Sequence, residues 1–322
     1  YPPVRPLAPS PASAHHGGAV GLGAGRSPNM LDVQDVVGKQ FIDTSLMGRV
    51  VVDGEQSSAA LDVMSRFAVD PRWLCYLPPT MAPVATSSRP GHLEHPDEAL
   101  AYFDRVGVNQ VVCQEKHMGS RAVVVVARDP AAAADRFGIG NDHGGVVVTR
   151  TGRPFFADAG LTGKLIDQLR AAVTTAGWWD TLATSWLVLD AELMPWSAKA
   201  ADLIQNHYAP GAASGSAMLA AASQALAAAE ARGVEVGELA ARTSERAATI
   251  ASYRQAYQSY CWPTDDLAGV RLAPFQLLAA EGEVLARRPH QWHMERAHEL
   301  HQSDPSLIAP TRHRTVDPVS YT

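Results

Sequence analysis

Lysine is scarce in this sequence. Only four of its 27 basic residues are lysines, and the rest are arginines. The arginine bias has two explanations: a GC-rich genome, or selection for phosphate contacts, which the forked guanidinium makes in a fixed geometry. The formal net charge of −6 excludes a protein that binds nucleic acid over its whole surface. The four lysines are Lys39, Lys116, Lys164 and Lys199.

Long hydrophobic runs and a full set of cysteine pairs are also missing. No stretch approaches the ~18 apolar residues of a membrane-spanning helix, so we expect no transmembrane helix and no membrane partner. The three cysteines, Cys75, Cys113 and Cys261, are odd in number and far apart. This pattern argues against a disulfide framework and fits a reducing cytosol. We therefore expect a cytoplasmic protein.

The sequence begins with Tyr1 rather than Met, and its composition changes in blocks. Residues 1–30 are rich in Pro, Gly, Ser and Ala without hydrophobic periodicity, so we expect a disordered linker that follows another domain. The remaining blocks predict an ordered extension with a helix over residues 57–67, a core in two parts, and an Ala-rich helical insert. The expected boundaries are 31–90 for the extension, 91–196 and 263–322 for the core, and 197–262 for the insert.

Local sequence signals predict which segments of the core are helices and which are strands. Pro96 favours a helix start because proline fits the first helical turn. The spacing of Leu165, Leu169 and Val173 predicts a helix over residues 162–176. Apolar runs rich in valine and other strand formers predict strands over residues 109–115, 121–128, 146–149, 185–193 and 270–278.

The insert should consist of helices interrupted at Gly233, which favours a helix stop. Ile250, Tyr253, Tyr257 and Tyr260 recur at spacings of three and four, which is more typical of a packing stripe than of a binding surface. The sequence thus predicts an α+β core with a helical insert.

The segment E-K-H-M-G-S-R, residues 115–121, carries the most specific chemistry. Lys116 is expected in a tight turn between two buried strands. Lysine has an ordinary pKa near ~10.4 and must lose a proton to act as a nucleophile, which burial or a nearby cation favours. Gly119 would let the backbone pass close to a nucleotide, and Arg121 could reach a phosphate or ribose. Taken alone, K-x-x-G is short, and a solvated hairpin lysine is the ordinary interpretation.

Two further strings, in the same order, change that interpretation. D-A-E at residues 190–192 and the apolar strand A-P-F-Q-L-L at residues 273–278 accompany K-x-x-G. This set resembles the covalent nucleotidyltransferases: DNA ligases, RNA ligases and capping enzymes. The longer strings E-K-H-M-G-S-R-A-V-V-V-V, T-R-T-G-R-P-F-F and D-A-E-L-M-P-W-S-A-K-A resemble the adenylyltransferase (RNA ligase) domain of bacterial polynucleotide kinase-phosphatases. The resemblance covers roughly residues 31–300, and the opening residues resemble the end of the preceding phosphatase domain.

The resemblance implies a covalent nucleotidyltransferase fold, with largely antiparallel sheets flanked by helices, and a role for each matching residue. Lys116 would form a lysyl–AMP adduct with ATP, and Glu115 would lie against the adenine. Arg121 would contact the sugar or phosphate, and Glu192 would accept hydrogen bonds from the ribose. Phe275 would stack on the base. Arg150 and Arg153 could contact phosphates or the RNA end, although all but Lys116 could also be structural or solvated.

The implied reaction seals RNA in three steps with Mg²⁺ or Mn²⁺. Lysine is adenylylated by ATP, AMP passes to an RNA 5′-phosphate, and an RNA 3′-hydroxyl displaces AMP. The implied partners are kinase and phosphatase domains of the same polypeptide, and a methyltransferase that modifies the 2′-hydroxyl at the RNA 3′ end. Two alternatives remain: a DNA ligase or capping-type enzyme, and a non-catalytic RNA-binding or scaffold fragment.

Two features fall outside the family pattern. The E-G-x-x-x-K strand and the later lysine pair of the family are not found, and no lysine follows Lys199. We therefore expect a chain truncated at its C-terminus that is weak or inactive alone, with one wall of the nucleotide pocket missing. Four histidines also cluster near the C-terminus, and a polar helix face is a better interpretation than a zinc site because no zinc motif accompanies them. They are His290, His293, His298 and His301.

Overall fold

The structure is a computed structural model, and it describes residues 38–44, 48–55, 68–73, 85–140 and 142–318. The chain divides into two compact units, residues 1–61 and 62–322. In the first unit, β1 (Gln40–Thr44) and β2 (Gly48–Val52) form an antiparallel hairpin, across which Arg49 pairs with Asp43. The linker expected over residues 1–30 and the helix expected over residues 57–67 lie outside the described residues.

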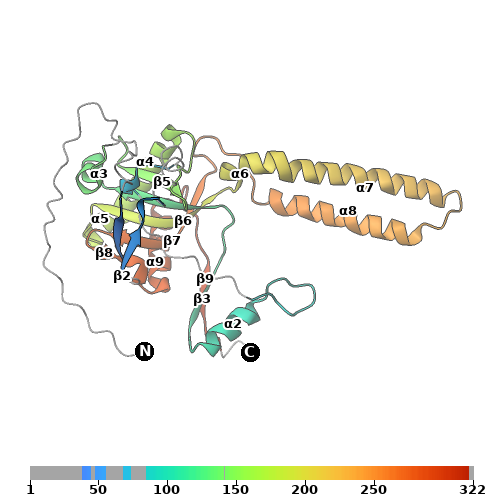
Figure 1. Cartoon of the computed structure of the whole chain (residues 1–322), viewed down its shortest axis with the longest axis horizontal. Helices are drawn as coiled ribbons and strands as arrows, with labels where there is room; N and C mark the ends of the chain where they lie inside the picture. Colours follow the sequence, from blue (N-terminus) through green and yellow to red (C-terminus); the bar gives the residue numbers. More distant parts are fainter. Residues whose placement is uncertain (1–37, 45–47, 56–67, 74–84, 141, 319–322) are drawn as a thin grey trace. The chain divides into compact units, whose positions relative to one another are not determined.

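A five-stranded antiparallel sheet is the centre of the second unit (Figure 1). Its strand order is β5-β4-β6-β7-β8. The α+β class with antiparallel sheets flanked by helices is confirmed, and each strand predicted in this sheet is present within a few residues. The strands are β4 (Ser120–Ala127), β5 (Gly145–Thr149), β6 (Trp186–Met194), β7 (Arg271–Ala280) and β8 (Glu283–Val284).

Both faces of this sheet are covered, which explains why its central strands are continuously apolar. Ala122, Val124 and Val126 of β4 face one core, with α4 (Ala159–Thr175), α5 (Trp178–Thr181) and α9 (His290–Ser303). Val123 and Val125 face the other core. That second core includes Trp73 of η2 (Pro71–Trp73) and α3 (Pro130–Phe137). The short η4 (Leu285–Arg287) leads from β8 towards α9.

The strand before Lys116 does not pair with the strand after it. β3 (Val111–Gln114) pairs antiparallel with β9 (His313–Val316), while both edges of β4 are occupied by β5 and β6. The expectation of a tight turn between two buried strands is therefore wrong, since only Val111 of β3 is buried. Residues 115–119 instead connect two sheets. The helix expected at Pro96 is confirmed as α2 (Pro96–Arg105), where the His95 ring accepts the backbone N–H of Asp97.

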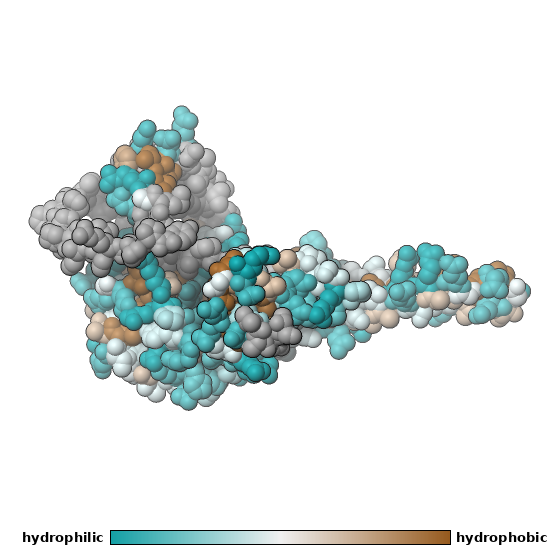
Figure 2. Space-filling view, turned by 90° about the horizontal axis from the view of Figure 1, so that it is seen from below, coloured by the Kyte–Doolittle hydropathy of each residue, from teal (hydrophilic) through white to brown (hydrophobic). Residues whose placement is uncertain are grey.

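The predicted insert is helical. It contains α6 (Ser197–Leu203), a π-helical turn η3 (Ile204–Tyr208), α7 (Ala209–Glu230) and α8 (Gly237–Gln258). Gly233 lies between the two long helices with φ of +82°, in the left-handed region that glycine adopts easily. The two helices pack as a hairpin that projects from the sheet (Figure 1). Figure 2 shows much of this hairpin as white and pale brown surface, because many of its alanines are exposed.

Candidate nucleotide site

Lys116 lies in the segment that connects β3 to β4, and its side chain is exposed. Gly119 anchors this segment against β6. A Cβ at position 119 would overlap the carbonyl oxygen of Leu193, so the close approach requires glycine. The sequence predicted a close approach to a nucleotide at Gly119, whereas the structure shows a close approach to the neighbouring strand. Glycine therefore holds the Lys116 segment at the end of the central sheet.

Glu192 binds the same segment from β6. Its Oε1 accepts the backbone N–H of Gly119 at 2.9 Å. Burial raises the pKa of the Glu192 carboxyl, and the charge of Asp190 raises it further, while the Gly119 hydrogen bond and the Lys116 and Arg121 charges lower it; the net direction is upward. A partly buried carboxylate thus binds the backbone of the segment that carries the Lys116 amine.

Arg121 stands directly opposite Glu192 in the β4–β6 register. Its guanidinium forms a forked pair with Asp190, in which Nε donates to Oδ1 at 2.8 Å and Nη2 donates to Oδ2. The Asp190 side chain is 1% exposed and that of Arg121 is 14% exposed. Hydrogen bonding to Asp190 raises the pKa of Arg121, so the guanidinium stays charged. Two of the predicted site residues, Arg121 and Glu192, therefore stand opposite each other, next to the segment that carries Lys116.

Glu115 is held by a partner that the sequence did not suggest. Arg312 donates from Nε to Glu115 Oε2 at 3.0 Å, and the Glu115 backbone N–H donates to the Arg312 carbonyl at 2.8 Å. The hydrogen bond from Arg312 lowers the pKa of Glu115. His117 reaches the same segment, with Nε2 2.9 Å from the Thr311 hydroxyl. The segment before β9 therefore fixes the start of the Lys116 segment.

Phe275 is the extra residue of a β-bulge in β7. Pro274 stands opposite Ala191 and Gln276 opposite Asp190, which leaves Phe275 without a direct partner on β6. Phe275 is only half-buried and is not part of either hydrophobic core. The bulge thus places the Phe275 ring on β7, the strand next to that of Asp190, and outside both hydrophobic cores.

Arg150 and Arg153 lie in the turn after β5 and are exposed. Because Thr149 pairs with Ala122 in the β4–β5 register, this basic group lies at the same end of the sheet as Arg121. Lys199 joins this group from α6, where its ammonium donates to the carbonyls of Pro154 at 3.1 Å and Phe155 at 2.7 Å. Burial lowers the pKa of Lys199, and the charge of Arg153 lowers it further. Sequence reasoning did not connect Lys199 with this turn, because the contact joins residues 44 apart.

Asp190 is the other residue that sequence reasoning missed. The string D-A-E indicates Asp190 as a site residue together with Glu192, because residues 190 and 192 of a strand point to the same face. In that string the family resemblance assigns a role only to Glu192. The buried Asp190 gives the site a fixed negative charge, and Arg121 compensates that charge.

The four C-terminal histidines do not assemble a metal site. In the described part of the chain, no group of three or more His, Cys, Asp and Glu side chains could hold a metal ion. His290 contacts the Gln114 amide oxygen, and His293 Nδ1 accepts the Leu277 N–H at 3.2 Å. His301 bonds the Ile308 carbonyl at 2.7 Å, and His298 lies 3.0 Å from the Gln302 amide. The histidines serve separate contacts around α9.

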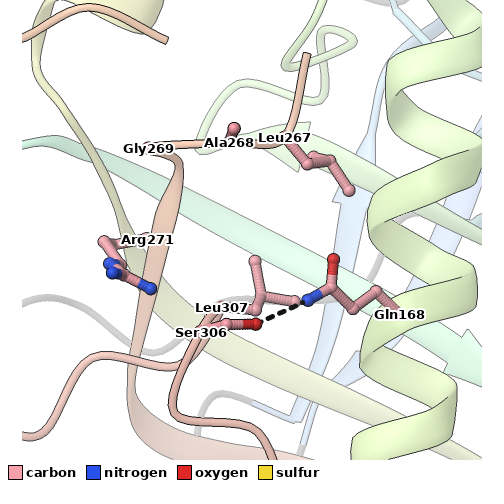
Figure 3. A pocket seen from close by; sticks show the side chains of 7 residues that line it. All are labelled: Gln168, Leu267, Ala268, Gly269, Arg271, Ser306 and Leu307. Atoms are coloured by element: carbon pink, nitrogen blue, oxygen red, sulfur yellow. Dashed lines mark hydrogen bonds between the residues drawn. The ribbon is translucent and has the colours of Figure 1, made fainter. Parts of the chain in front are cut away.

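A pocket of about 270 Å³ lies apart from the predicted site residues (Figure 3). Gln168 of α4 reaches into it and donates to the Ser306 hydroxyl at 3.1 Å, beside Arg271 at the start of β7. None of the predicted site residues lines this pocket. Gln168 also donates to Asp304 at 2.8 Å, so the polar groups here already satisfy one another. The candidate site remains the surface around Lys116.

Comparison with protein families gives one match that covers most of the chain. The family described as PNKP adenylyltransferase domain, ligase domain, matches residues 59–321. No curated protein matches the chain. The family match confirms the resemblance found in the sequence, and residues 115–121, 190–192 and 273–278 all lie inside it.

Two solved structures align over much of the fold. They are described as structures of the Pnkp1/Rnl/Hen1 RNA repair complex and of the Pnkp1/Rnl/Hen1 complex, at 15% and 16% sequence identity. Each alignment has a TM-score of 0.48 and covers 76% and 74% of this chain, respectively. The chain spans only 64% and 63% of those chains. No helix among the described residues is long and apolar enough to cross a membrane.

Proposed function

Because the chain belongs to the family of PNKP adenylyltransferase ligase domains, we propose that it forms a lysyl–AMP adduct on Lys116. The observation that carries this proposal is that Glu192, which stands opposite Arg121, binds the backbone of the segment that carries the exposed Lys116. The neutral amine attacks the α-phosphorus of ATP. The nitrogen–phosphorus bond forms, the bond to the bridging oxygen breaks, and pyrophosphate leaves. The lysine proton passes to solvent before the attack.

The residues around Lys116 fit a nucleotide in three ways. Arg121 holds a charged guanidinium in a fixed direction, as phosphate binding requires. One carboxylate oxygen of Glu192 accepts the Gly119 N–H, which leaves the other to accept a ribose hydroxyl. The half-buried Phe275 ring offers a surface for the base. Positioned charges of this kind contribute more to phosphoryl transfer than covalent assistance does.

A divalent cation, Mg²⁺ or Mn²⁺, belongs to this proposal. Magnesium commonly binds one or two carboxylates together with substrate phosphates and waters, so three protein ligands are not needed. Glu192 fits this role better than Asp190, because Arg121 already engages both Asp190 oxygens. The ion would neutralise phosphate charge.

We further propose RNA as the acceptor of the AMP group. By resemblance to the family, a 5′-phosphate oxygen of RNA attacks the phosphorus of the adduct and breaks the lysine–phosphorus bond. A 3′-hydroxyl then attacks the activated 5′-phosphate, releases AMP and joins the strands. The arginines of the turn after β5, Arg150 and Arg153, are the candidates for contact with the RNA end. Kinase and phosphatase domains would prepare the ends, and a 2′-O-methyltransferase would modify the 3′ end.

Adduct mapping tests this function. The chain is incubated with α-phosphate-labelled ATP and Mg²⁺ or Mn²⁺, and the labelled peptide is identified by mass spectrometry. We expect label on Lys116 and none on Lys116→Ala, while Lys164→Ala and Lys199→Ala keep it. Label on another residue, or full labelling of Lys116→Ala, contradicts the proposal. Labelled GTP in place of ATP separates a capping-type enzyme, and a chase with 5′-phosphorylated RNA or DNA identifies the acceptor.

A further inference from the structure

Aromatic rings gather at the root of the α7–α8 hairpin. The Trp196 and Tyr208 ring centroids are 5.2 Å apart, and Tyr257 lies 5.8 Å from Tyr208. Tyr253 stacks on Tyr208 at 5.8 Å with an interplanar angle of 10°. Only Tyr257 of this cluster is buried, whereas Tyr253 is 38% exposed. The expectation that these rings serve only packing holds for Tyr257 but leaves the Tyr253 ring open.

Two arginines share the face of α8 that carries Tyr253. With 3.6 residues per turn, Arg242, Arg246 and Tyr253 lie within an arc of about 40°. Both arginines are exposed. We call this face, defined by Arg242, Arg246 and Tyr253, the Arg–Tyr flank. α8 also carries Glu238 and Glu245, so its positive excess is slight. Any ligand of the flank must therefore use the ring as well as the charges.

The flank leads back to the candidate nucleotide site. Trp196 lies two residues after the end of β6, the strand that carries Glu192, and its backbone N–H donates to the Tyr260 carbonyl at 3.0 Å. Tyr260, just after α8, is itself 37% exposed. Trp196 contacts Tyr208, on which Tyr253 stacks. A connected line of rings thus joins the strand of Glu192 to the arginines along α8.

We propose that the Arg–Tyr flank binds single-stranded RNA and holds the strand whose end enters the Lys116 site. An exposed ring stacks on a base whatever its identity, and neighbouring guanidiniums bind the phosphates. The cations of the flank complement a phosphate backbone, and its exposed ring complements an unpaired base. The inference rests on the proposed function, because it assumes that the site acts on RNA.

The test measures binding of an unstructured, dye-labelled 12-nucleotide RNA with a 5′-phosphate by fluorescence anisotropy. Tyr253→Ala should weaken binding about 10-fold, while Tyr253→Phe keeps the ring and should bind nearly as well as the unchanged chain. The double variant R242Q/R246Q should lower the slope of log affinity against log salt by about 1.4, or ~0.7 for each lost phosphate contact. Adenylylation with ATP alone should stay unchanged in all these variants.

Two matched controls separate the flank from general effects. Arg254→Gln removes the same charge from another face of α8, and Tyr102→Ala removes a 51% exposed ring from α2. Both should bind RNA like the unchanged chain. Equal RNA affinity of Tyr253→Ala and Tyr102→Ala, or equal salt slopes for the arginine variants and Arg254→Gln, overturns the inference. If Tyr253→Ala unfolds, the salt slope of R242Q/R246Q against that of Arg254→Gln decides. An adenylylated chain without RNA affinity also overturns it, whereas flank-dependent RNA binding without adduct contradicts only the proposed function.

Discussion

Asp190 of β6 holds Arg121 of β4 across the central sheet, with Arg121 Nε 2.8 Å from Asp190 Oδ1. The carboxylate is 1% exposed, so the arginine compensates a charge that is otherwise removed from water. The same arginine stands opposite Glu192. One side chain thus serves the stability of the sheet and the electrostatics of the candidate site, and changing it should affect both.

Arg121→Ala should therefore lower the free energy of unfolding by about 3–5 kcal/mol, because Asp190 is left buried without its partner. Urea denaturation measures this change. Arg128→Ala, just after the far end of β4, is the matched control. Arg128 pairs with Asp180 at 3.1 Å in an exposed setting, so this change should cost at most about 1 kcal/mol. The double variant R121A/D190N should recover part of the loss. Equal costs for Arg121→Ala and Arg128→Ala would show that the buried pair is not structural.

Glu192→Gln should separate nucleotide binding from folding. The raised pKa of the Glu192 carboxyl means that the folded chain holds this proton more tightly than the unfolded chain. Stability is then lost as pH rises from the ordinary value through the folded pKa, and the loss persists at neutral pH. Glutamine cannot ionise but can still accept the Gly119 N–H, so the variant should melt at the same or a higher temperature at pH 7. Adenylylation should fall about 10-fold or more, as for a lost hydrogen bond to a charged group.

Glu281→Gln is the control for that variant. Glu281 is exposed and its carboxylate also accepts a backbone N–H, from Ser185 at 3.1 Å. It should affect neither adenylylation nor the pH dependence of melting. A lower melting temperature for Glu192→Gln at neutral pH, with adduct formation unchanged, would mean that Glu192 only supports the Gly119 backbone.

The strands and helices of the second unit could be predicted because their apolar periodicity is strong, as in β4 and α4. The pairing of β3 could not, since alternation shows which side chains are buried and not which strand lies alongside. Its partner β9 lies about 200 residues away, as the 197-residue separation of Glu115 and Arg312 shows. Likewise Lys116, Arg121 and Glu192 follow from their motifs, but the Arg121–Asp190 pair depends on cross-strand register.

His293 should make the fold sensitive to acid. Burial and, to a smaller extent, the nearby His290 charge lower the pKa of His293 from 6.5 to about 4. The unfolded chain therefore binds the proton more readily, so stability is present above pH 6.5 and is lost as pH falls towards 4, by up to about 3 kcal/mol. His293→Asn keeps an acceptor for the Leu277 N–H and should flatten unfolding free energy across this range. His298→Asn, an exposed change on the same helix, should leave the slope intact. Equal pH slopes of the unfolding free energy in the two variants would mean that another group causes the acid sensitivity.

Glu115 and Arg312 offer a direct test of whether Glu115 contacts the adenine. Their side chains are 35% and 86% exposed, so losing this pair should change the unfolding free energy by at most about 1 kcal/mol in either variant. If Glu115 serves the base, Glu115→Ala should raise the KM for ATP in adenylylation about 10-fold, because a hydrogen bond from the base to a charged group is lost. Arg312→Ala removes the same pair but leaves the carboxylate available, so its KM should stay within about twofold of the unchanged chain. The backbone hydrogen bond between the two residues persists in both variants, which keeps β3 and β9 in register. A similar KM increase in both variants would instead mean that the pair merely positions the Lys116 segment.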